Sequence, residues 1–136
     1  QEGEGNVTPQ KIREEFFVDA HFSLNSGYRG VYSLYKDKSD TPTALFFCND
    51  TMAIGGLKAF SELGIRVPED VSIIGFDDIE PVKFTIPALT SVHQDQQEMG
   101  RQAANLIMDY LKNGDFKINR VILEQKLVIR ESVRKI

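Results

Sequence analysis

The chain has 136 residues, of which 41% are hydrophobic and 26% charged, so it has the size of one domain and enough apolar side chain to exclude global disorder. Its 16 basic and 20 acidic residues give a net charge of −4, which argues against binding of a nucleic-acid backbone by this chain alone. A single cysteine excludes an internal disulfide, and no apolar run approaches the roughly 18 residues of a membrane span.

The first predicted elements are a short strand and a helix. The apolar run at 16–18 predicts a strand that ends near Ala20. Ser23 is suited to cap a following helix, in which apolar side chains recur along one face over residues 24–35.

The next segment predicts two buried strands with a helix between them. Residues 43–48 form a continuous apolar run, which is typical of a strand buried on both faces in a parallel sheet. Asp50 is a natural N-cap for a helix over 51–63, and Gly64 fits the left-handed position past its end. Residues 71–76 predict the second buried strand.

The last third predicts a long connection, a helix and a closing strand. Residues 79–94 have no clear period and are interpreted as an irregular connection of the kind that is often functional. A helix is expected over 95–112, and one or two strands over 121–129. Strands that alternate with helices predict a parallel sheet with helices on both faces.

Ligands of such sheets bind beyond the carboxyl ends of the strands. The first predicted strand is followed by Phe22, the second by Asn49 and Asp50, and the third by Asp77 and Asp78. An aromatic ring can stack on a sugar or a purine, while amides and carboxylates bind hydroxyl or ring N–H groups. Each residue also has a structural alternative as a helix cap, a turn, a loop brace or ordinary core.

Features of known catalytic sites are few. The chain has no Gly-x-Ser-x-Gly elbow, Walker loop or Gly-x-Gly-x-x-Gly turn. Cys48 lies in an apolar run and is predicted to be a buried thiol. An alternative stays open in which the protein is an enzyme that holds Mg²⁺ at the strand ends through Asp50, Asp77 and Asp78. The sequence otherwise predicts no enzyme, metal or cofactor.

The predicted helix over 51–63 has an apolar arc of roughly 160°, which is wider than one contact with a sheet requires. Either part of this face packs on another subunit, or the helix is buried deep in one domain.

Several motifs occur in the order and spacing of a known family. They are the Asn-Asp-Thr-Met-Ala-Ile-Gly run at 49–55, the stretch at 64–78, Pro-Ala-Leu-Thr-Ser-Val at 87–92, Met-Gly with Ala-Ala at 99–104, and Arg-Glu-Ser at 130–132. Together with Ser-Leu-Asn-Ser-Gly-Tyr at 23–28, they resemble the lactose/galactose-repressor (LacI/GalR) family of bacterial transcription regulators from about residue 16 onward.

The resemblance implies the effector-binding region of a regulator, with a two-lobed fold like that of periplasmic sugar-binding proteins. It places residues 1–94 in the second lobe, 95–123 in a helix and strand of the first lobe, and 124–136 in the return to the second lobe. The family's helix-turn-helix, its hinge and most of the first lobe are not in this chain, whose start at Gln1 is interpreted as an internal cut or a processed end.

The resemblance also implies roles for single residues. By motif, Phe22 stacks on the effector and Asn49 and Asp77 hold its polar groups. Gln94 lies at the crossing between the lobes and is the fourth implied effector-binding residue, because this position contacts the ligand in some members. The helix at 51–63 and the segment near 79–86 match the family's dimer contact, which implies an interface through Met52, Leu57, Ala59, Phe60 and Phe84. His21 stands where a small or acidic residue is more usual.

The implied function is a cytoplasmic, homodimeric repressor that senses a sugar or sugar phosphate, less often a purine, and binds operator DNA only through the missing domain. The alternative is a periplasmic sugar-binding protein of a transport system. Because the apolar stripe of the helix at 95–112 has lost the sheet that covers it in the family, we expect this helix to pack on a second copy, to exchange between copies, or to fold back.

Overall fold

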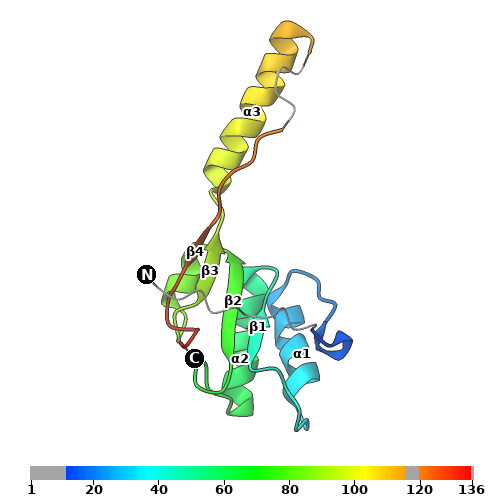
Figure 1. Ribbon diagram of the computed structural model, residues 1–136, viewed down its shortest axis with the longest axis vertical. Helices are drawn as coiled ribbons and strands as arrows, with labels where there is room; N and C mark the ends of the chain where they lie inside the picture. Colours follow the sequence, from blue (N-terminus) through cyan, green and yellow to red (C-terminus); the bar gives the residue numbers. More distant parts are fainter. Residues whose placement is uncertain (1–11, 116–119, 136) are drawn as a thin grey trace, which may run out of the picture.

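A four-stranded sheet organises the structure, which is a computed structural model that describes residues 12–115 and 120–135. Strands β1 (Ala44–Phe46), β2 (Ser72–Asp77) and β3 (Thr90–His93) are parallel, and β4 (Lys126–Val128) pairs antiparallel with β3. Their order across the sheet is β1-β2-β3-β4 (Figure 1). The predicted parallel sheet is therefore confirmed for three strands, and β4 makes the sheet mixed.

Helices α1 (Leu24–Tyr35) and α2 (Asp50–Leu63) lie where they were predicted, although α2 begins one residue earlier than expected because Asn49, and not Asp50, is its N-cap. Ser23 caps α1 by accepting a hydrogen bond from the backbone N–H of Ser26, whose own hydroxyl accepts from the N–H of Ser23. Gly64 ends α2 with φ of 70°, a conformation that glycine adopts without steric cost. Both predicted helices are confirmed.

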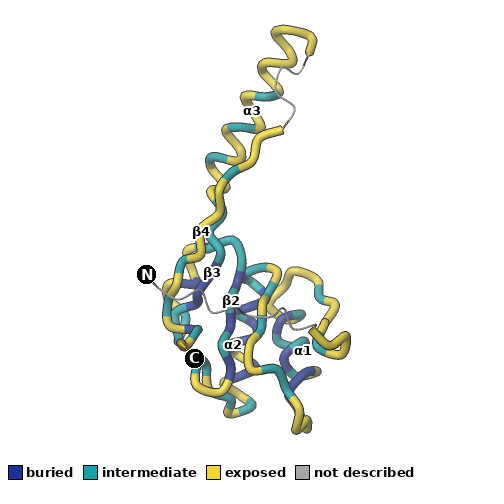
Figure 2. The backbone as a smooth tube through the Cα atoms, viewed as in Figure 1, coloured by how far each residue is buried: buried dark blue, intermediate teal, exposed yellow. Residues whose placement is uncertain are grey.

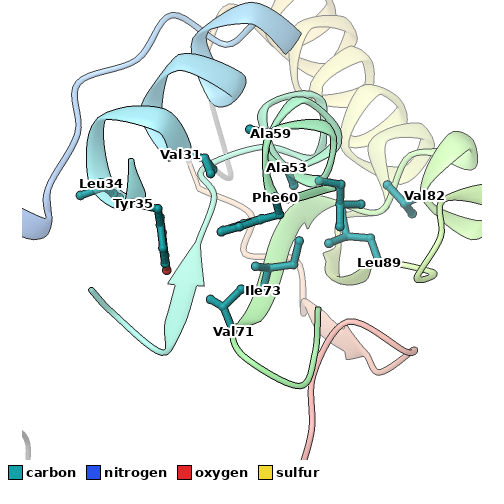
Figure 3. Packing of buried hydrophobic residues seen from close by; sticks show 11 residues of the cluster. Val31, Leu34, Tyr35, Ala53, Ala59, Phe60, Val71, Ile73, Val82 and Leu89 are labelled. Atoms are coloured by element: carbon teal, nitrogen blue, oxygen red, sulfur yellow. The ribbon is translucent and has the colours of Figure 1, made fainter. Parts of the chain in front are cut away.

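The hydrophobic core lies between these two helices and one face of the sheet (Figure 3). Phe60 of α2 lies at its centre, with its ring edge-on to Tyr35 of α1 at 5.0 Å between centroids, and Ile73 of β2 packs against the same cluster. The opposite face carries Phe46, which is mostly exposed. In the described residues α1 and α2 thus cover one face, and the expectation of helices on both faces is corrected.

The predicted first strand at 16–18 is wrong. Residues Glu14–Phe16 form a single 3-10 turn, closed by hydrogen bonds from Phe16 N–H to Arg13 C=O (3.0 Å) and from Phe17 N–H to Glu14 C=O (3.1 Å). Phe16 packs against the core while Phe17 is largely exposed. Local turn bonds therefore satisfy the backbone without strand pairing.

The predicted irregular connection at 79–94 contains the third strand of the sheet. A 3-10 helix, Glu80–Phe84, is followed after residues 85–89 by β3. The strand was missed because it opens with Thr90 and Ser91, whose polar side chains give no apolar signal. Both are fully buried, since their hydroxyl groups make hydrogen bonds to neighbouring segments.

Helix α3 (Gln96–Asn113) projects from the rest of the structure as an arm, and residues 120–125 return beside it (Figure 1). Asp95 caps its first turn and Gly114 ends it, so the helix predicted over 95–112 is confirmed. None of its residues is buried (Figure 2), so it does not fold back onto the core.

Among the described residues, no helix combines the length and apolarity needed to cross a membrane.

Candidate functional site

The carboxyl ends of β1, β2 and β3 meet at one edge of the sheet because the three strands are parallel neighbours. Asn49 lies in the segment that follows β1, Asp77 is the last residue of β2, and Gln94 follows the last residue of β3. This topology brings three of the four predicted effector-binding residues to the same edge. Ligands of open α/β sheets bind at such an edge.

Asp77 and Gln94 contact each other directly. The side-chain amide of Gln94 donates a hydrogen bond of 2.9 Å from Nε2 to Oδ1 of Asp77. The pair lines an open depression of about 330 Å³ whose lining residues are mostly of polar type: Asp77, Asp78, Ile79, His93, Gln94, Asp95, Gln96 and Gln97. A carboxylate and an amide side by side can bind vicinal hydroxyl or N–H groups of a small ligand.

Asn49 is the N-cap of α2. Its Oδ1 accepts a hydrogen bond of 2.8 Å from the backbone N–H of Met52. Sequence analysis gave that role to Asp50, which is instead the first residue of the helix. Within the described chain, the amide nitrogen of Asn49 donates to no other residue, so a ligand at this edge could accept from it.

Phe22 is placed at the same end of the structure but apart from the Asp77–Gln94 pair. It immediately precedes the cap of α1, and the first turn of α1 packs on α2, where Gly55 faces the carbonyl of Leu24. Phe22 is 69% exposed and its φ is 43°. Phe22 does not line the depression at Asp77, so its role as a stacking residue stays a prediction.

Asp50 is fully buried and acts as an acceptor between strands. Its Oδ1 accepts from the hydroxyl of Ser91 at 2.6 Å, and its Oδ2 accepts from the backbone N–H of Ile79 at 2.9 Å. Burial raises the pKa of this carboxyl above its usual value, and the two hydrogen bonds oppose that effect. The residue predicted to cap a helix therefore holds the loop after β2.

A second set of polar contacts surrounds Asp78 and was missed by sequence analysis. Arg130 donates to Oδ1 of Asp78 at 2.6 Å, and His93 Nδ1 lies 3.1 Å from Oδ2. Arg130 also donates to the backbone carbonyl of Leu89 at 2.7 Å. Arg130 belongs to the Arg-Glu-Ser run that carried the family resemblance, but nothing in the sequence indicated its partner 52 residues away.

The three strand-end carboxylates do not converge on a metal site. Asp50 faces Ser91, Asp77 faces Gln94, and Asp78 is paired with Arg130. No cluster of three or more metal-ligating side chains occurs in the described parts of the chain. The alternative of a magnesium enzyme thus has no support from the placement of these residues.

Two further predictions concern exposure. Met52, Leu57, Ala59 and Phe60 are buried within the chain itself, and the last three belong to its hydrophobic core. Their burial explains the wide apolar arc of α2 and corrects their assignment to an exposed dimer contact, whereas Phe84 is 77% exposed.

The thiol of Cys48 was expected to be buried. Cys48 is instead exposed and lies two residues past the end of β1, whose own Ala44 and Phe46 are exposed too.

Comparison with known proteins identifies the relatives of this chain. The family model described as a periplasmic binding protein-like domain matches residues 6–133. The HTH-type transcriptional repressor PurR of Haemophilus influenzae (strain PittEE) is 39% identical over 128 residues, which is 92% of this chain and 38% of the repressor. The ribose operon repressor of Haemophilus influenzae (strain ATCC 51907) is 35% identical, over 90% of this chain and 36% of that protein. The chain thus spans well under half the length of these relatives.

Solved structures give the same result. A putative LacI transcriptional regulator from Bacillus cereus subsp. cytotoxis superposes with a TM-score of 0.86 at 28% identity, over 91% of this chain and 44% of that one. The Escherichia coli transcriptional repressor ascG superposes with a TM-score of 0.78 at 38% identity, over 90% of this chain and 44% of the repressor. The regulator CelR, solved as a complex with cellobiose, superposes with a TM-score of 0.80 at 33% identity, over 89% of this chain and 37% of CelR. The chain therefore belongs to the periplasmic binding protein-like domain family, and its relatives are LacI-type transcriptional regulators.

Proposed function

We propose that this chain is the effector-sensing part of a LacI-type transcriptional regulator and that it binds a sugar or a related small polar molecule. The observation that carries the proposal is the Asp77–Gln94 pair, which lines an open depression at the carboxyl edge of three parallel strands. Relatives of the same fold have been solved with cellobiose and with ribose. Carboxylate and amide groups suit the hydroxyl groups of such ligands.

The other parts of the site follow from this assignment. Asn49 supplies a free amide nitrogen at the same edge, and Phe22 supplies an exposed ring for stacking. Residues 1–94 and 124–136 are assigned to one lobe and residues 95–123 to the other, so that the chain crosses between lobes at Gln94, just before α3, and returns near residue 124. Phe84, which is exposed, is the dimer-contact residue that remains from the family motif.

The same proposal sets the partners. A repressor acts on operator DNA, and the net charge of −4 argues that another domain of a longer protein makes that contact. Such a protein works in the cytoplasm as a homodimer and binds its effector without catalysis. The periplasmic transport protein is not retained, because the relatives are repressors.

Binding changes regulation only if the effector has different affinities for two arrangements of the protein. Asp77 and Gln94 come from the end of β2 and from the beginning of the crossing segment. The affinity of a ligand that contacts both residues therefore depends on the angle between the sheet and the arm. This relation supports coupling between the site and the arrangement of the lobes.

The test is a thermal-shift screen of this chain and of the longer gene product with ribose, cellobiose, sugar phosphates and purine bases. Asp77→Ala should weaken the binding of any hit by about 10-fold or more, because it removes a charged hydrogen-bond acceptor. Asp70→Ala is the matched control, since Asp70 is an exposed carboxylate at the turn before β2. Equal affinities of wild type and Asp77→Ala would contradict the assignment.

A further inference from the structure

The corner at which β2 ends has an unusual backbone conformation. Asp77 has φ of 108° and Asp78 has φ of 57°, so two consecutive residues with side chains lie in the region that favours glycine. Such conformations persist only where the surroundings hold them, and they cluster at functional sites. The first of these residues carries the carboxylate of the candidate site.

Neighbouring groups fix the backbone after Asp77. The N–H of Asp78 donates to the hydroxyl of Ser91 at 3.1 Å, and the N–H of Ile79 donates to buried Asp50 at 2.9 Å. Ser91 in turn donates to Asp50. These bonds hold the corner from the side of the sheet.

Arg130 holds the same corner from the other side. Its guanidinium donates at 2.6 Å to Asp78, while its second terminal nitrogen donates at 2.7 Å to the carbonyl of Leu89. Its own backbone N–H donates at 2.8 Å to the hydroxyl of Thr90. The side chains of Arg130 and Asp78 are 14% and 9% exposed. Solvent therefore screens this ion pair much less than a surface pair.

From this geometry we infer that Arg130 is a positioning residue for Asp77. It anchors Asp78 to β3, so that the Asp77–Asp78 corner keeps its left-handed backbone and presents the Asp77 carboxylate to Gln94 and to a ligand. Arg130 itself does not line the depression at Asp77. The inference rests on the proposed function for its ligand, but the positioning of Asp77 can be measured without one.

A planar, forked side chain is needed for this role. Arg130 bonds two acceptors on different segments at once, namely the Asp78 carboxylate and the Leu89 carbonyl. A lysine has one terminal nitrogen on a flexible stem and cannot reproduce that fork. Arg130→Lys should therefore lose part of the positioning, and Arg130→Gln should lose most of it.

The experiment follows the side-chain amide protons of Gln94 by NMR in the 136-residue chain. In Arg130→Gln we expect the Gln94 amide to move toward its free chemical shift and to exchange at least about tenfold faster with solvent. Arg66→Gln is the matched control, because Arg66 also lies 2.6 Å from a carboxylate, that of Asp70, but at the turn before β2. The control should leave Gln94 unchanged.

The outcome that overturns the inference is an Arg130→Gln protein with an unchanged Gln94 amide and with Ile73 still protected from exchange, which shows that it is folded. If Arg130→Gln does not fold, Arg130→Lys is measured in the same way, and an unchanged Gln94 amide there overturns the inference too.

Calorimetric titration with ribose and with cellobiose tests the proposed function separately. If wild type binds one of these sugars, Arg130→Gln should weaken binding about tenfold in the wild-type background but not in an Asp77→Asn background. Equal effects in both backgrounds would overturn the inference. Failure of wild type to bind either sugar counts against the proposed function for these sugars, while the Gln94 signal still decides the role of Arg130.

Discussion

The carboxylate of Asp50 lies directly over the backbone of Gly75, where a side chain on β2 would stand. A β-carbon at residue 75 would overlap Oδ1 of Asp50 and would lie 2.9 Å from Cδ2 of Leu89. Glycine at this position therefore opens the path by which a residue of α2 reaches Ser91 on β3. The loop that carries the candidate site depends on that path.

Substitution of Gly75 should consequently destabilise the fold. In Gly75→Ala the methyl group must displace Asp50 or Leu89, and we expect a loss of about 1–3 kcal/mol in the free energy of unfolding, as for other overpacked cores. Urea unfolding followed by circular dichroism measures the loss. Gly100→Ala on α3 is the control, because nothing lies near the added carbon. A Gly75→Ala protein as stable as wild type would contradict the overlap.

How far the sequence predicts the fold can be judged from particular elements. Continuous apolar runs predicted β1 and β2, Ser23 predicted the start of α1, and Gly64 predicted the end of α2, since both kinds of signal are local. Strand β3 was missed because its buried residues are Thr90 and Ser91, whose burial depends on hydrogen-bond partners far away in the sequence. The strand predicted at 16–18 was wrong because apolar residues alone do not fix pairing.

The same limit applies to the candidate site. The spacing of polar residues after the strands predicted which side chains reach the carboxyl edge, and family motifs added Gln94. The sequence could not predict that Asn49, and not Asp50, would cap α2, because either residue type can cap a helix. Nor could it pair Asp78 with Arg130, since contacts across 52 residues are set by the assembled sheet.

The hydroxyl of Ser91 should matter more at neutral than at acidic pH. Its hydrogen bond lowers the pKa of Asp50, whereas burial raises it. Without that bond the folded-state pKa rises further above the unfolded value, and stability is then lost as pH rises through it. We expect Ser91→Ala to cost about 1–3 kcal/mol at pH 7 and clearly less at pH 4.

Urea unfolding at several pH values measures the difference between wild type and Ser91→Ala. Ser33→Ala serves as the control, because the Ser33 hydroxyl donates only to a carbonyl within its own helix, on an exposed surface. A cost of Ser91→Ala that does not change between pH 4 and pH 7 would argue against a charged Asp50 as the partner.

Glu62 on α2 should show the opposite dependence. Lys58 lies 2.8 Å from its carboxylate and the hydroxyl groups of Tyr28 and Tyr32 donate to it, which lowers the pKa of Glu62 to about 2. A lowered folded-state pKa gives stability that is present above the unfolded value and is lost as pH falls through the folded one. The difference in Tm between wild type and Glu62→Gln should therefore shrink between pH 5 and pH 2.

Because Glu62 is at the surface, 0.5 M salt should reduce that difference at pH 7 as well. Glu80→Gln is the matched control, since Glu80 is exposed and makes no ion pair with any described residue. Scanning calorimetry gives both Tm values, and a Glu62→Gln difference that grows toward pH 2 would contradict the expected sign.

The exposed apolar residues of α3 should make this chain self-associate. Met99, Ile107, Met108 and Leu111 are all at least 46% exposed, and each large apolar side chain is worth about 1.5–3 kcal/mol when fully buried. Three outcomes were expected for this helix: packing on a second copy, exchange between copies, or folding back. Since α3 does not fold back onto the core, only the two that involve a second copy are left. Sedimentation velocity should find a dimer or a larger species, and Ile107→Glu with Leu111→Glu should shift it toward monomer. Asp109→Asn, a polar exchange on the same helix, should leave the distribution unchanged. A monodisperse wild-type monomer with this stripe in water would contradict the expectation.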